Sequence, residues 1–209
     1  MNNRLPDINT KIRISVICEG PEEYDYLDTL SGLQVWNDKY KFDLVNAGGN
    51  GNIPARYQDK YQNDTSDLVL VFCDTEKKPY EQYEDIKRKI NEFHGTSDAA
   101  DLVIIFGNPC TMQIVIEHWK EIRLKSPAKS VNAPIIEECT GVENYKGRED
   151  QRQAVMNKIT PDNYADMKER VSRLSDVDTE KNSSNFAKFL IYFESEDDEW
   201  IERINEKLE

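Results

Sequence analysis

The feature that most constrains the fold is a run of five apolar residues, 68–72, with polar residues on both sides. A short run rich in valine and leucine is typical of a strand that is buried on both faces of a parallel sheet. Two carboxylates, Asp74 and Glu76, follow this run where the strand is expected to end. In open α/β sheets, ligands collect at the carboxyl edge of the strands. The stretch therefore predicts a buried sheet with a polar site at its edge.

A second apolar run near the amino terminus is also followed by an acid. Residues 12–18 are predicted to form a strand, and Glu19 stands directly after it. If this strand pairs with strand 68–72, the carboxylates of Glu19, Asp74 and Glu76 converge at one sheet edge. Carboxylate oxygens are the ligands that Mg²⁺ and Mn²⁺ prefer. The pattern predicts a site for Mg²⁺ or Mn²⁺ with these three residues as ligands.

Acids after a buried strand also have structural uses. Asp74 and Asn108 stand where each would cap the helix that follows. Glu22 and Glu23 are interpreted as surface residues at the start of a helix that Pro21 opens, where the helix dipole favours negative charge. The metal site remains the preferred interpretation of the three edge acids, because separate parts of the chain point to one place.

Strand and helix alternate over residues 11–125. The apolar periodicity predicts strands at 12–18, 42–45, 68–72 and 102–106. Helices are predicted to follow them, from residue 21 onward and at 54–61, 80–93 and 112–124. Such alternation is typical of a parallel sheet that helices cover. The chain is therefore expected to have an α/β fold with a central, mostly parallel four-stranded sheet flanked by helices.

Residues 126–209 are predicted to form a mainly helical extension that packs on the same core. Helices are expected near 148–159, from residue 161 onward and at 197–208, and a short extended piece is expected at 133–136. Residues 186–193 are apolar and fit either a strand or a helix.

Charge and composition narrow the classes of function. The net charge of −13 argues against a simple nucleic-acid-binding module, since such modules present lysine and arginine in excess. No apolar stretch approaches the ~20 residues that a membrane helix needs, and the first residues lack a signal peptide, so we expect a cytoplasmic protein without membrane contact. The four cysteines form no CxxC pair, which argues against a zinc site.

A glycine-rich loop, residues 46–52, precedes the predicted helix 54–61. Glycines such as Gly49, next to Asn50, let the backbone come close to an anion with the amide groups of the following helix exposed. Glycine and asparagine also mark ordinary turns, which is the commoner use of this pattern. The loop is kept as a candidate contact to a phosphate.

Several short motifs together resemble the Toprim domain, the metal-binding fold of topoisomerases, primases and a group of phage-defence nucleases. The residues that carry the resemblance are Glu19-Gly20, Asp74-Thr75-Glu76, the loop 48–52, Asn108-Pro109-Cys110 and His118-Trp119. The last two resemble the RloB-like branch, and the loop resembles the OLD-type nucleases. Met112 stands where RloB-like proteins carry an acid, and the GxxxxGK[ST] loop of an ATPase is absent from the sequence.

The resemblance implies a metal-dependent nuclease that cleaves DNA or RNA, with a role in phage defence. Glu19, Asp74 and Glu76 would be the catalytic and metal-binding residues, and Glu19 would complete the metal shell or act as general acid and base. The expected partners are nucleic acid, a protein of a defence system and a second copy of the chain. The residues expected to bind substrate are Gly49, Asn50, Asn108, His118, Lys120 and Arg123.

Two other functions stay open at this stage. The first is a non-catalytic interaction or regulatory protein on a Toprim-like scaffold, which the acidic composition and Met112 favour. The second is a different α/β nucleotide-binding protein that uses the loop 48–52, although the sequence lacks a phosphate-binding lysine motif.

Overall fold

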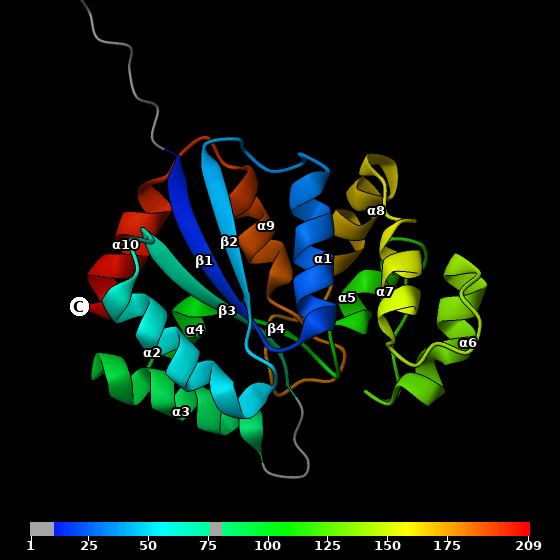
Figure 1. Ribbon diagram of the computed structural model, residues 1–209, viewed down its shortest axis with the longest axis horizontal. Coiled ribbons are helices and arrows are strands. Elements are labelled where there is room, and N and C mark those ends of the chain that lie inside the picture. The colour runs from blue at the N-terminus through cyan, green and yellow to red at the C-terminus, as the bar shows by residue number, and fades with distance from the viewer. Residues whose placement is uncertain (1–10, 76–80) are drawn as a thin grey trace, which may run out of the picture.

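A computed structural model describes residues 11–75 and 81–209. Its centre is a sheet of four parallel strands in the order β2-β1-β3-β4, which confirms the α/β fold expected from the sequence (Figure 1). The strands are β1 (Ile12–Cys18), β2 (Tyr40–Asn46), β3 (Leu68–Asp74) and β4 (Ile104–Gly107). Every residue of β3 is buried, as its unbroken apolar run predicts.

Helices follow each strand and make up the carboxyl-terminal part. The first half of the chain contributes α1 (Pro21–Gly32), a 3-10 turn η1 (Asn50–Asn52), α2 (Ile53–Asn63), α3 (Gln82–His94), α4 (Ala99–Val103) and α5 (Met112–Ile116). The second half contributes α6 (Lys129–Thr140), α7 (Glu149–Met156), α8 (Pro161–Val171), α9 (Phe186–Glu194) and α10 (Glu199–Leu208).

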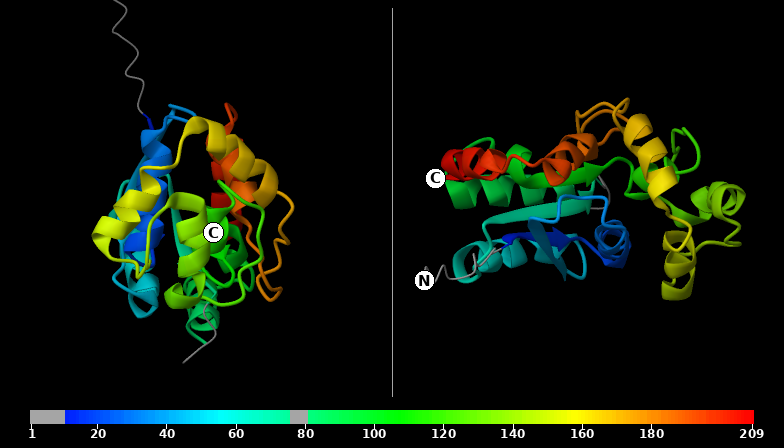
Figure 2. Two further views of the ribbon diagram at one scale, coloured as in Figure 1. Left: turned by 90° about the vertical axis from the view of Figure 1, so that its right-hand side faces the viewer. Right: turned by 90° about the horizontal axis from the view of Figure 1, so that it is seen from above.

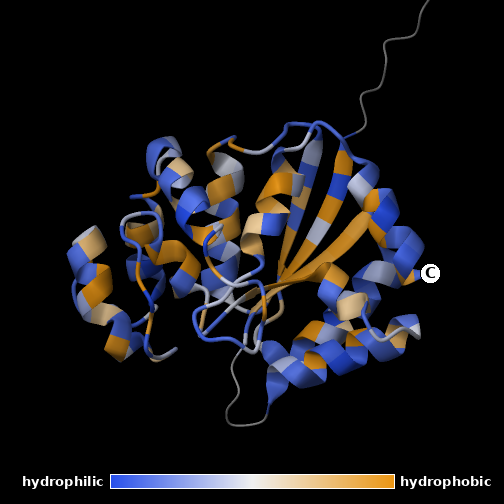
Figure 3. Cartoon of the chain, turned by 180° about the vertical axis from the view of Figure 1, so that it is seen from behind, coloured by the Kyte–Doolittle hydropathy of each residue, from blue (hydrophilic) through white to orange (hydrophobic). Residues whose placement is uncertain are grey.

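The sheet is the hydrophobic middle layer of the molecule (Figure 3). On one face, Phe186 of α9 stacks on Phe72 of β3 and contacts Tyr26 of α1, with ring centroids 5.7 and 5.9 Å apart. On the other face, α2 and α3 pack together through Tyr57 and Phe93, whose ring centroids lie 6.2 Å apart. Figure 1 shows the sheet between α2 and α3 on one side and α1 and α9 on the other, and the view from above in Figure 2 shows the yellow-green α6 and yellow α7 at the end of the molecule away from the strands.

The carboxyl-terminal helices contact the sheet to different degrees. The core that contains the strands continues into α9 and α10, where Trp200 stacks on Tyr192 at 4.7 Å and donates a hydrogen bond to Tyr40 of β2 at 3.0 Å. Helices α6 and α7 lie farther from the sheet, beyond α1 (Figure 1). None of the helices in the described ranges is long and apolar enough to span a bilayer.

Residues 186–193, which fit either a strand or a helix, form helix α9. Its buried residues are spaced at i, i+3, i+4 and i+7, which is the helical period: Phe186, Phe189, Leu190 and Phe193. The extended piece predicted at 133–136 is wrong, because these residues lie inside α6. Asn132, Ile136 and Thr140 are buried at intervals of four residues, which places them on one helix face.

The predicted helix 112–124 is also wrong in its length. Helix α5 ends at Ile116, and the buried side chain of Gln113 holds the backbone that follows it. Gln113 accepts a hydrogen bond from the Leu124 amide at 2.9 Å and donates to the Ile122 carbonyl at 2.7 Å. These bonds satisfy backbone groups that a helix would have paired along its own axis.

The packing of α9 on the sheet leads to a stability prediction. Phe186→Ala removes a fully buried ring and should lower the free energy of unfolding by about 3–4 kcal/mol, measured by urea denaturation. Ile191→Ala on the same helix is the matched control, since Ile191 is 68% exposed and should cost about 0.5 kcal/mol or less. Equal losses for both variants would contradict the placement of α9.

Candidate functional site

Parallel pairing of β1 with β3 brings Glu19 and Asp74 together. Cys18 stands opposite Phe72 in the register of the two strands, so the residues that follow them meet at the carboxyl edge. The Glu19 amide donates to the Phe72 carbonyl, and the Asp74 amide donates to Oε2 of Glu19, both at 2.9 Å. Glu76, the third acid of the predicted site, lies outside the described residues.

Asp74 is held by the loop that follows β4. Thr111 donates its amide and its hydroxyl to Oδ1 of Asp74, at 2.6 and 2.8 Å. Burial, together with the negative charges of Glu23 and Glu19, raises the pKa of Asp74 well above its usual value. The carboxylate is therefore fixed in orientation but poorly compensated in charge, which is a recurrent property of functional acids.

The prediction that Glu22 and Glu23 lie on the surface is wrong. Both are buried, with 8% and 4% of their surface exposed. Glu23 accepts a hydrogen bond from the Gly20 amide at 3.0 Å, as the third residue of a capping box. Burial, reinforced by the charge of Glu22, raises the pKa of Glu23. The two side chains extend the acidic cluster of Glu19 and Asp74.

Residues from the carboxyl-terminal extension cover Glu22. Lys129, at the start of α6, places its ammonium 2.5 Å from Oε2 of Glu22, and the Tyr145 hydroxyl donates to Oε1. Gly147 makes room for this lysine, because a Cβ at that position would lie 2.7 Å from the Lys129 Nζ. The sequence shows helix-start glutamates but not the distant segment that covers them, so their burial could not be read from it.

Gly49 binds the backbone of Glu19, whereas Asn50 lines a separate cavity of about 540 Å³ at the start of α3. The Gly49 amide, at a φ of 120° that favours glycine, donates to the Glu19 carbonyl at 2.8 Å. Asn50 is 4% exposed, and its Oδ1 finds no hydrogen-bond partner within the described part of the chain. The loop thus supports Glu19, and the Gly49 amide is already engaged.

His118 lies in the core. It is 1% exposed, and its Nε2 and Nδ1 are each 3.0 Å from a partner, the Tyr26 hydroxyl and Oδ1 of Asn163. Burial lowers its pKa to about 4, so the ring is neutral at physiological pH. This placement gives no support for a contact between His118 and substrate.

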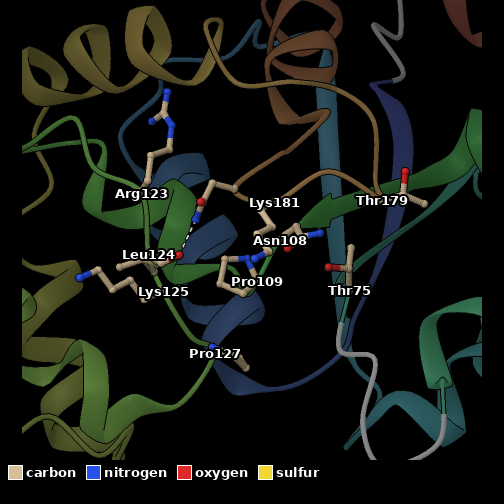
Figure 4. Close-up of a pocket in the computed structure, with 10 residues that line it drawn as sticks. Thr75, Asn108, Pro109, Arg123, Leu124, Lys125, Pro127, Thr179 and Lys181 are labelled. Atoms are coloured by element: carbon tan, nitrogen blue, oxygen red, sulfur yellow. Dashed lines mark hydrogen bonds between the residues drawn. The ribbon is translucent and has the colours of Figure 1, made fainter.

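The other predicted substrate-binding residues lie at the surface. Lys120 forms an ion pair with Glu138 at 2.6 Å, and Arg123 pairs with the fully buried Glu117 at 3.3 Å. Asn108 and Arg123 both line a cavity of about 800 Å³, as does Thr75, the residue that follows Asp74 in the chain (Figure 4). The fold brings Asn108 and Arg123 to the same sheet edge as Asp74.

The edge acids have the donor chemistry that a hard divalent cation requires, since their ligands are carboxylate oxygens. Within residues 11–75 and 81–209, no three histidine, cysteine or acidic side chains are arranged to hold a metal ion. The buried thiols of Cys18, Cys73 and Cys110 have pKa values raised by burial, so they are protonated packing groups.

Comparison of the chain with protein-family models, with curated proteins and with solved structures gives no significant match. The Toprim resemblance therefore depends on the short motifs in the sequence.

The raised pKa of Asp74 predicts how stability depends on pH. A native carboxyl whose pKa is raised binds its proton more tightly than the unfolded chain does, so its ionisation destabilises the fold as pH rises above the unfolded value of about 3.9. Asp74→Asn keeps an acceptor for Thr111 and removes this charge. In EDTA, the variant should have a higher urea midpoint than wild type at pH 7 and lose that advantage near pH 4.

Asp176→Asn, at an exposed loop position, is the control and should change the midpoint little at either pH. A midpoint for Asp74→Asn below that of wild type at pH 7 would show that the ionised carboxylate stabilises the fold.

Proposed function

We propose that the protein is a metal-dependent, Toprim-type nuclease that hydrolyses phosphodiesters in DNA or RNA. One observation carries the proposal: the Glu19 carboxylate binds the Asp74 amide at 2.9 Å, so acids from two neighbouring parallel strands meet at the carboxyl edge of the sheet. A role in phage defence, a cytoplasmic location and a protein or homodimeric partner belong to the same proposal.

The chain's own residues would hold and orient the metal. Glu19 and Asp74, with Glu76, are the proposed ligands of Mg²⁺ or Mn²⁺. When bound, such an ion polarises the phosphodiester and lowers the pKa of a water nucleophile. The two hydrogen bonds from Thr111 fix the Asp74 carboxylate, which prevents it from rotating away from the edge. Glu23, close enough to raise the pKa of Asp74, adds negative charge that favours a cation.

A second candidate is a non-catalytic protein on the same scaffold. The observation that favours it is the ion pair between Lys129 and Glu22, because the extension already supplies a positive charge to the acidic cluster. In this case the acids would be a buried structural cluster, and a stable protein partner would be the expected ligand.

A cleavage assay separates the two candidates. Wild type is incubated with single-stranded and duplex DNA and RNA in Mg²⁺, Mn²⁺ or EDTA. The nuclease proposal predicts cleavage only with metal, and a rate at least about a hundredfold lower for Asp74→Asn, since a lost metal ligand removes several kcal/mol of transition-state stabilisation. Asp176→Asn should cleave at the wild-type rate. Cleavage in EDTA, or equal cleavage by Asp74→Asn, would rule out this mechanism.

A further inference from the structure

A cavity opens beside the acidic cluster and has no role in holding its carboxylates. Its volume is about 800 Å³, within the range of small-molecule sites. Three segments form it: the end of β3 with the turn after β4, residues 123–127, and the loop 179–182 that precedes α9 (Figure 4). Thr75, the residue after Asp74, lines its inner end.

Among the residues that the structure describes, the charged side chains that line the cavity are all cationic: Arg123, Lys125 and Lys181. Arg123 is partly compensated by Glu117 and Glu121, at 3.3 and 3.7 Å. Lys125 and Lys181 are exposed, and neither has an acidic partner within ion-pair distance in the described ranges, unlike their neighbours Lys120 and Lys129. In a chain of net charge −13, uncompensated lysines at one cavity favour an anionic ligand.

Thr75 provides an independent sign of a ligand. The residue is 4% exposed, and its hydroxyl finds no hydrogen-bond partner among the described residues. In Figure 4 this hydroxyl points toward Asn108 and Pro109, into the cavity. A buried hydroxyl without a partner costs free energy, which a polar ligand atom in the cavity would offset.

The rest of the lining is half apolar, with the polar side chains of Asn108, Thr179 and Asn182 beside three non-polar residues. Pro109, Leu124 and Pro127 contribute non-polar surface between Thr75 and the lysines. A nucleotide needs apolar surface for its base, cations for its phosphate and a hydroxyl for its sugar or base edge. Proteins that bind single strands combine a cationic path for the backbone with surfaces on which bases pack.

We propose that this cavity binds one nucleotide of a single-stranded nucleic acid, with the adjoining phosphate directed toward Asp74. The inference deepens the proposed function, since it names the substrate class of the same site. A base paired in a duplex is stacked between its neighbours and cannot enter the cavity unless it flips out. Single strands should therefore bind more tightly than duplexes of the same sequence.

The test measures binding without cleavage. Fluorescence anisotropy with labelled single-stranded RNA and DNA is recorded in EDTA, so metal-dependent chemistry does not contribute. The double variant Lys125→Gln/Lys181→Gln should bind roughly tenfold more weakly. For this variant, the slope of log K against the logarithm of the salt concentration should be shallower by about 0.7 for each lysine removed.

The matched control is Lys158→Gln/Lys207→Gln, which removes two exposed lysines that do not line the cavity and should bind as wild type. Thr75→Val should weaken binding several-fold without lowering the urea midpoint, because the hydroxyl has no hydrogen-bond partner within residues 11–75 and 81–209. A lower midpoint would instead assign Thr75 a purely structural role.

Three results would overturn the inference: wild-type affinity in the lysine double variant, equal affinity for duplex and single strand, or a free nucleoside monophosphate that competes as well as the oligonucleotide. The outcomes for the two proposals are separable. Binding that depends on the cavity lysines, without metal-dependent cleavage, would refute the nuclease proposal and support the cavity proposal. Metal-dependent cleavage, with binding that does not depend on these lysines, would support the nuclease proposal and refute the cavity proposal.

Discussion

The pairing of β1 with β3 is the constraint on which the rest of the structure depends. It places the Glu19 carboxylate against the Asp74 amide, and this contact brings a group of acids together at the carboxyl edge of the sheet. The glycine-rich loop then attaches to the Glu19 carbonyl, and the turn after β4 attaches to the Asp74 carboxylate through Thr111. Two connections of the sheet are thus tied to two acidic residues.

Concentrating carboxylates in a buried place is costly, and the molecule offsets only part of that cost. Lys129 and Tyr145 satisfy Glu22, and the amide of Gly20 satisfies Glu23. Asp74 has hydrogen bonds but no cationic partner in the described part of the chain, and burial and its acidic neighbours raise its pKa. A proton or a metal ion is the remaining way to relieve this repulsion. The carboxyl-terminal extension therefore supplies a positive charge and a hydrogen bond to the acids at the sheet edge, and it also adds apolar residues to the core.

Local patterns predicted most of the sheet, because each strand carries its own apolar run and its own polar ending. The same reasoning placed Glu19 beside Asp74. It failed for Glu22 and Glu23, which it placed at the surface, because the segment that covers Glu22 is distant in the sequence and contributes Lys129 and Tyr145. It also overextended α5, since the side chain of Gln113 redirects the backbone through bonds that periodicity does not register. Contacts with distant parts of the sequence account for the errors at the two glutamates, and side-chain hydrogen bonds account for the error in α5.

The central claim is that the acids at the sheet edge share a divalent cation. Calorimetric titration of Mn²⁺ into wild type and Glu19→Gln tests it most directly, with Mg²⁺ as competitor. The account predicts saturable binding to wild type that Mg²⁺ displaces, and binding at least about tenfold weaker in Glu19→Gln, because a lost carboxylate ligand lowers affinity for a hard cation. Equal Mn²⁺ binding by both proteins, or no binding by wild type, would contradict it.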